Sequence, residues 1–130
     1  IVAQQPSILV STIENDYGIN RTYDTLKILK KCFPKTEFVW CTGMDNALGF
    51  HRWYKWRDIL DMVATAHIAR PPAPSLIRNC PLKRQSTQRH IYMRKSYPVE
   101  LSPRHTYWIM QRKMIDISST EIREKSNKNQ

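Results

Sequence analysis

The chain has 130 residues, 41% of them hydrophobic, and its 21 lysine and arginine residues against 11 aspartate and glutamate residues give a formal net charge of +10. This composition predicts one folded domain with a hydrophobic core, and no apolar run approaches the roughly 20 residues that a membrane span requires. The charge indicates a polyanionic partner and by itself leaves open nucleic acid, a membrane surface or phosphate-rich small molecules.

The first strongly patterned segment, residues 7–14 (SILVSTIE), is rich in β-branched side chains and predicts a strand. Turn residues follow, and residues 21–33 carry apolar side chains at helical spacing, with Thr22 as the N-cap and Pro34 ending the helix. Residues 36–43 predict a second strand, apolar enough to be buried on both faces, which is typical of a parallel sheet.

The next elements continue the alternation of strands and helices. Residues 44–60 predict a loop with one or two short helices, and residues 62–70 predict a third strand that is closed by prolines. Residues 72–103 mix prolines with many basic residues and predict a loop-rich excursion with room for a short helix. A strand or broken strand over residues 105–117 and a short helix from about Ser119 close the chain. The order predicts an α/β fold built from βαβ units with right-handed crossovers.

Cysteines and histidines give no sign of a metal site. Cys32, Cys41 and Cys80 are widely spaced and form no CxxC pair, so neither a disulfide framework nor a zinc site is expected. The four histidines form no HxxH or HExxH pattern, and His67, inside a predicted strand, is expected to be a core or edge residue. With no signal peptide at the amino terminus, these features favour the cytoplasm.

The sequence ISSTEIR places hydroxyl groups and a cation where a strand gives way to a helix. A capping box, with Ser118 as N-cap and Glu121 three residues later, is one interpretation. However, Ser119 and Thr120 exceed what one cap needs, and Arg123 near the helix start opposes the helix dipole unless an anion lies there. The pattern therefore also predicts a phosphate cradle.

The sequence GMDNALGFHRWYKW follows the second predicted strand, at the sheet edge where open parallel sheets bind ligands. Gly43 permits close backbone approach, and Asp45 would bond a ribose hydroxyl or, alternatively, cap a helix. The aromatic residues Trp53, Tyr54 and Trp56 are of types that usually lie in a core. Four basic residues interleave with them: His51, Arg52, Lys55 and Arg57. That mixture suits stacking on a flat heterocycle that bears phosphate.

Together these stretches resemble bacterial nicotinate-nucleotide adenylyltransferases, of the nucleotidyltransferase superfamily with a Rossmann-like fold. ISSTEIR is similar to the ISSTxIR motif of that family, and FVWCTGMDNALGFHRWYKWRDI to its strand, G-x-D-N loop and F-x-x-W segment. RTYDTL resembles the start of its nicotinate-side helix, and HIARP its strand ending in Arg-Pro. The resemblance implies a Rossmann-like parallel sheet with flanking helices in a single domain, residues 1–130, in which residues 72–103 match nothing in the family.

The resemblance also implies roles for matching residues. Gly43 and Asp45 would contact nucleotide ribose. Trp53 would stack on the nicotinate ring, whose carboxylate would meet Thr22 and the Tyr54 amide. Mg²⁺ is implied with ATP, held mainly by substrate and water. No catalytic residue and no protein metal ligand is assigned in this chain. The ATP phosphates would be bound by four residues: Ser118, Ser119, Thr120 and Arg123.

Two departures from the family stand out. Its N-terminal GxFxPxHxGH motif, whose histidines stabilise the reacting phosphates, is absent from a chain that starts at Ile1. We therefore expect the carboxyl-terminal two-thirds or so of the enzyme, a fold incomplete at its amino terminus, and little turnover by this chain alone. Arg21 stands where the family commonly has tyrosine.

The reaction that the resemblance implies is adenylyl transfer from ATP to nicotinate mononucleotide, which gives deamido-NAD and pyrophosphate in NAD biosynthesis. Three alternatives stay open: a related adenylyltransferase with another phosphate acceptor, an inactive fragment, and a basic nucleic-acid-binding module. The last is disfavoured because RRM, KH and zinc-finger signatures are missing. The expected partners are ATP and nicotinate mononucleotide, with no membrane, and the sequence leaves the oligomeric state open.

Overall fold

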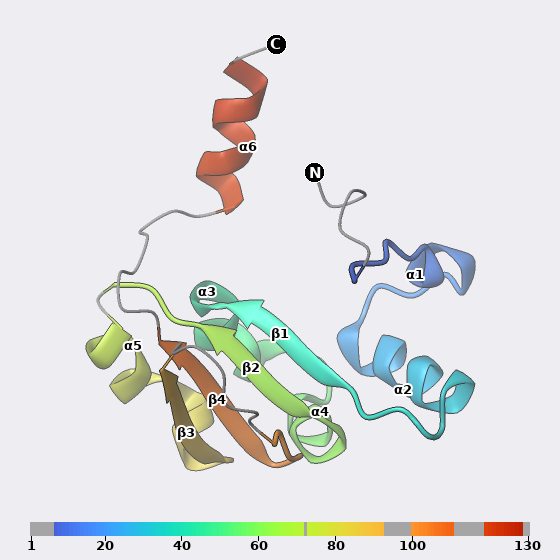
Figure 1. Cartoon of the computed structure of the whole chain (residues 1–130), viewed down its shortest axis with the longest axis horizontal. Helices are drawn as coiled ribbons and strands as arrows, with labels where there is room; N and C mark the ends of the chain where they lie inside the picture. The colour runs from blue at the N-terminus through green and yellow to red at the C-terminus, as the bar shows by residue number, and fades with distance from the viewer. Residues whose placement is uncertain (1–6, 72, 93–99, 111–118, 129–130) are drawn as a thin grey trace.

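The structure is a computed structural model that describes residues 7–71, 73–92, 100–110 and 119–128. Figure 1 labels the α-helices and the strands; the 3-10 helices are written η in the text. The elements in chain order are α1 (Ile13–Asp16), α2 (Thr22–Cys32), β1 (Val39–Gly43), α3 (Met44–Gly49), η2 (Phe50–Arg52), α4 (Trp56–Met62), β2 (Ala64–Ile68), α5 (Ala73–Asn79), η3 (Pro81–Arg84), β3 (Thr87–Tyr92), β4 (His105–Met110) and α6 (Ser119–Lys128).

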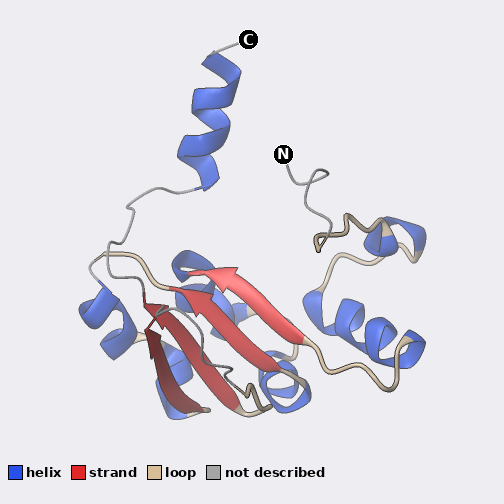
Figure 2. Cartoon of the chain, viewed as in Figure 1, coloured by secondary structure: helices blue, strands red, loops and turns tan. Residues whose placement is uncertain are grey.

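The sheet has four strands in the order β1-β2-β4-β3, and each neighbouring pair is parallel. The carboxyl ends of the strands therefore meet at one edge, where Gly43 pairs with Ile68, and Ile68 with Ile109. Figure 2 shows the strands as one layer (red), with helices (blue) behind it and at its sides. The predicted α/β fold, a parallel sheet with flanking helices, is confirmed.

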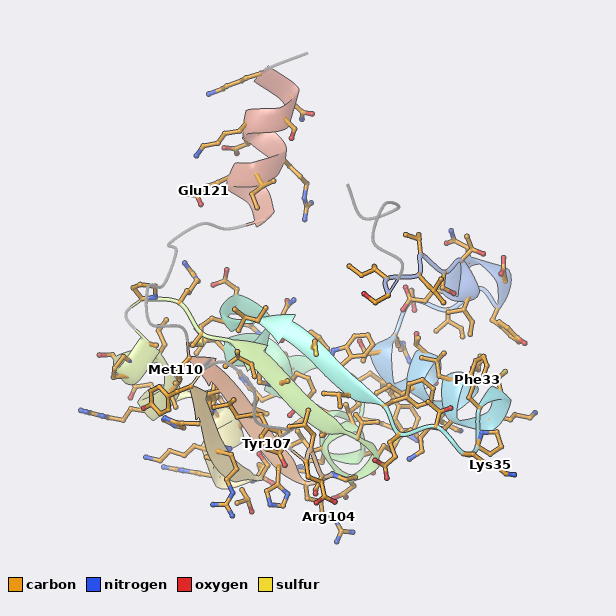
Figure 3. The ribbon with its side chains drawn as sticks, in the orientation of Figure 1. Phe33, Lys35, Arg104, Tyr107, Met110 and Glu121 are labelled. Atoms are coloured by element: carbon orange, nitrogen blue, oxygen red, sulfur yellow. The ribbon has the colours of Figure 1, made fainter. Side chains whose placement is uncertain are left out.

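The main core lies between one face of the sheet and the helices packed on it. Its largest fully buried side chains include Trp108 of β4, Phe50 of η2 and Leu26 of α2. Side chains alternate between faces along a strand, so Tyr107 points to the opposite face, where it joins a smaller apolar cluster. Its hydroxyl accepts a hydrogen bond from the Ser102 backbone N–H at 2.9 Å, and Figure 3 labels it on β4. Strand β4 is thus buried on both faces.

Several sequence predictions agree with these elements. The predicted helix over residues 21–33 is α2, the strand over residues 62–70 contains β2, and the helix from Ser119 is α6. The strand over residues 105–117 begins as β4, while its part beyond Met110 lies outside the described residues. No helix in the described ranges has the length and apolar character to cross a membrane.

The predicted strand over residues 7–14 is wrong. Residues 8–10 are exposed and in no regular element, and helix α1 begins at Ile13. β-Branched residues favour a strand only where a neighbouring strand supplies cross-strand contacts, and no described strand pairs with this segment. Instead, Ser11 Oγ accepts a hydrogen bond from the Ile13 backbone N–H at 3.2 Å, a local interaction that favours a turn.

The predicted strand over residues 36–43 is present as β1, but its predicted burial on both faces is wrong. β1 is an outer strand of the described sheet, and exposed residues alternate with half-buried ones along it. Val39 retains 38% of its accessible surface. The apolar sequence correctly indicated a parallel strand. It gave no sign that β1 lies at the edge of the described sheet, where no described strand pairs with its outer side.

The excursion over residues 72–103 contains more regular structure than the sequence predicts. The short helix for which the sequence left room is α5, and η3 and strand β3 follow it. β3 carries the exposed residues Arg89 and His90 and lacks the apolar run by which a strand is usually recognised. An outer strand tolerates charge because one of its edges faces solvent.

Candidate functional site

The carboxyl edge of the sheet brings together the predicted ribose-contacting residues. Gly43 ends β1 and is the N-cap of α3, and a Cβ built on it would meet nothing within 4 Å, so the space beside its backbone is open. Asp45 follows in the first turn of α3, and its carboxylate accepts a hydrogen bond from the Arg70 guanidinium in an ion pair. Arg70 lies just beyond the end of β2, the strand paired with β1.

This ion pair corrects the alternative interpretation of Asp45 as a helix cap. Helix α3 has no side-chain cap hydrogen bond, and its N-cap is Gly43. Arg70 is a residue that the sequence analysis did not single out. An ion pair between residues that follow two different strands leaves no local signal in the sequence, and only the parallel register of β1 and β2 brings the two together.

The aromatic residues between η2 and α4 point to different places. Trp53 is half-buried against Phe50, with ring centroids 4.7 Å apart and an interplanar angle of 30°, so one face of its indole is covered. Tyr54 is 45% exposed. Lys55, which follows it, has a left-handed backbone with φ of 50°. This conformation turns the chain before Trp56, the first residue of α4, so the three rings lie in different surroundings. The stacking of Trp53 on a ligand ring stays a prediction.

Tyr54 meets the amino-terminal end of α2. The Arg21 guanidinium carbon lies 4.4 Å from the centroid of the Tyr54 ring, and the Tyr23 ring makes an edge contact with it at 5.8 Å. The N-cap of α2 is Arg21, so the prediction that Thr22 caps this helix is off by one residue. Thr22 is the first helical residue, and its contact with a carboxylate stays a prediction.

Below the carboxyl edge, a buried histidine links β2 to β1. The ring of His67 is fully buried, and its Nδ1 lies 2.6 Å from Thr42 Oγ1. Thr42 Oγ1 itself donates to the Gly43 carbonyl at 3.1 Å, so we assign the Nδ1 proton to the bond with Thr42. Nε2 is buried without a hydrogen-bond partner, and burial lowers the pKa of His67 to about 4. Of the two expected positions for His67, core or edge, the structure shows the core.

The predicted phosphate cradle is only partly described. Ser118 lies outside the described residues, Ser119 and Thr120 begin α6, and Arg123 is an exposed residue of the same helix. Figure 1 shows α6 standing apart from the sheet, and Figure 3 labels Glu121 on it. The choice between capping box and cradle therefore stays open, and the cradle stays a prediction.

The described residues contain no candidate metal site. Among them, no three or more His, Cys, Asp or Glu side chains lie close enough together to hold an ion. The three cysteines are free thiols. Cys80 is buried, and its Sγ–H donates to the Ala47 carbonyl at 3.4 Å. Burial raises the pKa of the Cys80 thiol, so it is packed as an uncharged core group.

Comparison with known proteins identifies the family. The family model described as cytidylyltransferase-like matches residues 8–125. The chain belongs to this family. Its members are nucleotidyltransferases, and the predicted membership of the nucleotidyltransferase superfamily is thereby confirmed.

Relatives with assigned names fall within the same family. A "Probable nicotinate-nucleotide adenylyltransferase" from Cereibacter sphaeroides is 32% identical over 120 residues, which cover 92% of this chain and 64% of that protein. A protein of the same name from Erythrobacter litoralis is 45% identical over 69 residues, 53% of this chain and 32% of the relative. The chain thus spans less than two-thirds of the length of these cytidylyltransferase-like relatives.

A solved structure supports the fold. The nicotinic acid mononucleotide adenylyltransferase of Plasmodium falciparum, complexed with APC, superposes with a TM-score of 0.58 at 18% sequence identity. The match covers 95% of this chain and 56% of the other. At this identity the likeness establishes the architecture, and the parallel sheet of this chain is Rossmann-like, as the sequence predicts.

Proposed function

We propose that the chain serves adenylyl transfer from ATP to nicotinate mononucleotide, with deamido-NAD and pyrophosphate as products. The observation that carries the proposal is the contact between Arg21 and Tyr54. The guanidinium carbon of Arg21 lies 4.4 Å from the centroid of the Tyr54 ring. This contact brings together the two segments that would contact the acceptor, the start of α2 and the turn before α4, which are far apart in the sequence. The names of the relatives point to the same reaction.

At the acceptor end, a guanidinium offers a planar, permanently charged partner for a carboxylate. Arg21 is exposed, so one face of its guanidinium contacts Tyr54 while its N–H groups are available to a ligand. In this proposal Arg21 replaces the tyrosine common in the family and adds a charged contact to those of Thr22 and the Tyr54 amide. Such a contact distinguishes nicotinate, an anion, from nicotinamide, which is neutral.

At the nucleotide end, the open space beside Gly43 admits a ribose close to the backbone. Asp45 has two carboxylate oxygens, and Arg70 binds one of them. The other oxygen would accept a hydrogen bond from a ribose hydroxyl, while the ion pair holds the side chain in place. The location agrees with the general rule that ligands bind outside the carboxyl ends of parallel strands.

The chemistry needs no protein nucleophile. A phosphate oxygen of the mononucleotide attacks the α-phosphorus of ATP, a new P–O bond forms, and the bond to the bridging oxygen breaks as pyrophosphate leaves. The protein positions two anionic substrates and stabilises charge in the transition state. Ser118, Ser119, Thr120 and Arg123 are the proposed phosphate-binding residues. Mg²⁺ would neutralise phosphate charge, and because Arg70 engages Asp45, the phosphates and water would supply most of its ligands.

We expect the chain to bind nicotinate mononucleotide at least about tenfold more tightly than nicotinamide mononucleotide, because a charge-assisted hydrogen bond is worth about 1.5–3 kcal/mol. Isothermal titration calorimetry with both ligands measures this ratio. Arg21→Gln should reduce it to within about threefold, whereas Lys27→Gln, which removes an exposed cation on the same helix, should leave it unchanged. Equal affinities for both ligands in the unmodified chain would contradict the proposed acceptor.

We expect Arg123→Ala to weaken ATP binding about tenfold and to leave the affinity for nicotinate mononucleotide within about twofold, because Arg123 is assigned to the ATP phosphates alone. Lys128→Ala is the matched control, since it removes an exposed cation from the last turn of the same helix. Fluorescence titrations with each ligand separate the two effects. Similar losses for both ligands, or for both variants, would remove the cradle from the proposal.

A further inference from the structure

A basic cavity lies among the short helices that cover the sheet. Its volume is about 510 Å³, and it is lined by residues of η2, the start of α4, the end of α5 and the segment around η3. A cavity of this size is typical of sites for small molecules. The lining residues are His51, Trp56, Arg78, Asn79, Cys80, Pro81, Lys83, Arg84 and Gln85.

The lining is strongly basic. Arg78, Lys83 and Arg84 are exposed, and among the described residues no aspartate or glutamate lines the cavity. Among the described residues, the carboxylates of the ion pairs, Asp45 and Asp61, are bound to other arginines. Cations are favoured at the carboxyl end of a helix, which is a structural reason for Arg78 at the end of α5 and for Lys83 and Arg84 in the last turn of η3. It does not explain why these two helix ends converge on one cavity with no described acid in its lining.

The cavity wall is held in place by contacts between separate elements. Arg57 lies over the Trp56 ring at 4.8 Å, and its Nε donates to Gln85 Oε1 at 3.3 Å, which connects α4 to the end of η3. Leu82 is fully buried in the core, and Cys80, which is itself part of the lining, is buried and bonded to α3. The segment that carries Lys83 and Arg84 is therefore anchored by buried neighbours, so the cavity wall is largely formed before a ligand arrives.

We propose that this cavity is a binding site for a compact polyphosphate anion, separate from the proposed nucleotide site at Gly43 and Asp45. Three cations without a competing acid match the charge of a chain of two or three phosphates. The cavity is small and its three cations lie on two short neighbouring elements, which suits a compact anion better than an extended nucleic acid strand that binds along a long groove. The source of the phosphates is either a nucleoside triphosphate or an inorganic polyphosphate, and Trp56 gives the site a spectroscopic reporter.

The test uses sodium tripolyphosphate and ATP as probes on the full chain, by calorimetry. The triple variant Arg78→Gln, Lys83→Gln, Arg84→Gln should bind tripolyphosphate at least about tenfold more weakly than the unmodified chain. The control variant Lys31→Gln, Lys35→Gln, Arg89→Gln removes the same charge from exposed residues elsewhere and should change the affinity less than about threefold. Circular dichroism verifies that both variants fold.

A second measurement locates the bound anion. Tripolyphosphate should change the tryptophan emission of the chain, and Trp56→Phe should abolish that change while the heat of binding persists. Repeating the titration in Arg123→Ala, which removes the proposed ATP contact, should leave tripolyphosphate binding that the Arg78 triple substitution still abolishes, which makes a failure here distinguishable from a failure of the proposed function. If ATP binds more tightly than tripolyphosphate to that variant, the ligand of the cavity is a nucleoside triphosphate. If the two bind equally, the cavity recognises only the phosphate chain, and an inorganic polyphosphate is sufficient.

Three results would overturn the inference. Equal losses in the two triple variants would mean that net charge alone attracts the anion. An emission change that survives Trp56→Phe would place the anion elsewhere. Tighter binding of an oligouridylate than of tripolyphosphate, lost in the Arg78 triple variant, would make the surface an RNA site instead.

Discussion

Replacing Trp108 with alanine is expected to lower the free energy of unfolding by about 3–5 kcal/mol, as is typical for a large buried aromatic side chain. Trp108 is completely buried on β4, between β2 and β3, with its ring 5.3 Å from that of His67. Its Nε1–H donates to Gln88 Oε1 at 2.6 Å, which ties β4 to β3. The substitution leaves a cavity at the centre of the main core and an unpaired amide. Urea denaturation followed by circular dichroism measures the loss.

Trp53→Ala is the matched control for this experiment. Trp53 is only half-buried, and one face of its ring is free of Phe50. Trp53→Ala should lower the free energy of unfolding by about 1–2 kcal/mol, because it returns roughly half as much apolar surface to water as Trp108→Ala does. Trp53→Ala should also weaken the binding of nicotinate mononucleotide. Trp108→Phe should fall between the two, since it keeps most of the volume and loses the hydrogen bond. A stability of Trp108→Ala within about 1 kcal/mol of the unmodified chain would place the main core elsewhere.

The fold was predictable where the pattern is local. Residues 62–70 form a short apolar run between a helix and two prolines, and β2 is there. Residues 21–33 repeat apolar side chains at helical spacing, and α2 is there. In both cases burial against a neighbouring element agrees with the intrinsic preference of the segment. The strand predicted over residues 7–14 lacks that agreement, because the β-branched side chains have no described strand to pair with.

The candidate site was predictable to a lesser extent. The location of Gly43 and Asp45 follows from the rule for parallel sheets, which depends only on the order of strands and helices. The ion pair of Asp45 with Arg70 depends on the register of two strands, and the contact of Arg21 with Tyr54 depends on how α2 approaches the turn before α4. Long-range pairings of this kind leave no trace in a single sequence.

The aromatic and basic segment shows what spacing alone leaves out. The alternation of Trp53, Tyr54 and Trp56 with cations does not tell where each ring lies, and the positive φ of Lys55 turns the chain between the second and third rings. Trp53 then joins the core, Tyr54 meets α2, and Trp56 lines the basic cavity. One non-glycine residue with a left-handed backbone, which no sequence rule predicts for lysine, distributes the three rings among three environments.

Lowering the pH from about 7 to about 4.5 is expected to destabilise the chain through His67 by about 2 kcal/mol. Burial lowers the pKa of His67 from 6.5 to about 4. Between these values the unfolded chain binds a proton that the folded chain does not, so stability is complete above pH 6.5 and falls as the pH approaches 4. The physical cause is the position of Nε2, because its protonation would place a charge between Phe50 and Trp108 without a hydrogen-bond partner.

Urea denaturation at both pH values measures this effect, and a matched pair of variants isolates it from the titration of the carboxylates. His67→Gln keeps a side chain able to donate to Thr42 and removes the titrating group, so the acid sensitivity of this variant should be smaller by most of the ~2 kcal/mol. His90→Gln alters an exposed histidine on the outer strand β3 and should keep the acid sensitivity of the unmodified chain. If both variants lose stability equally on acidification, His67 is not buried in the neutral form, and the link between β1 and β2 beneath the candidate site is built differently.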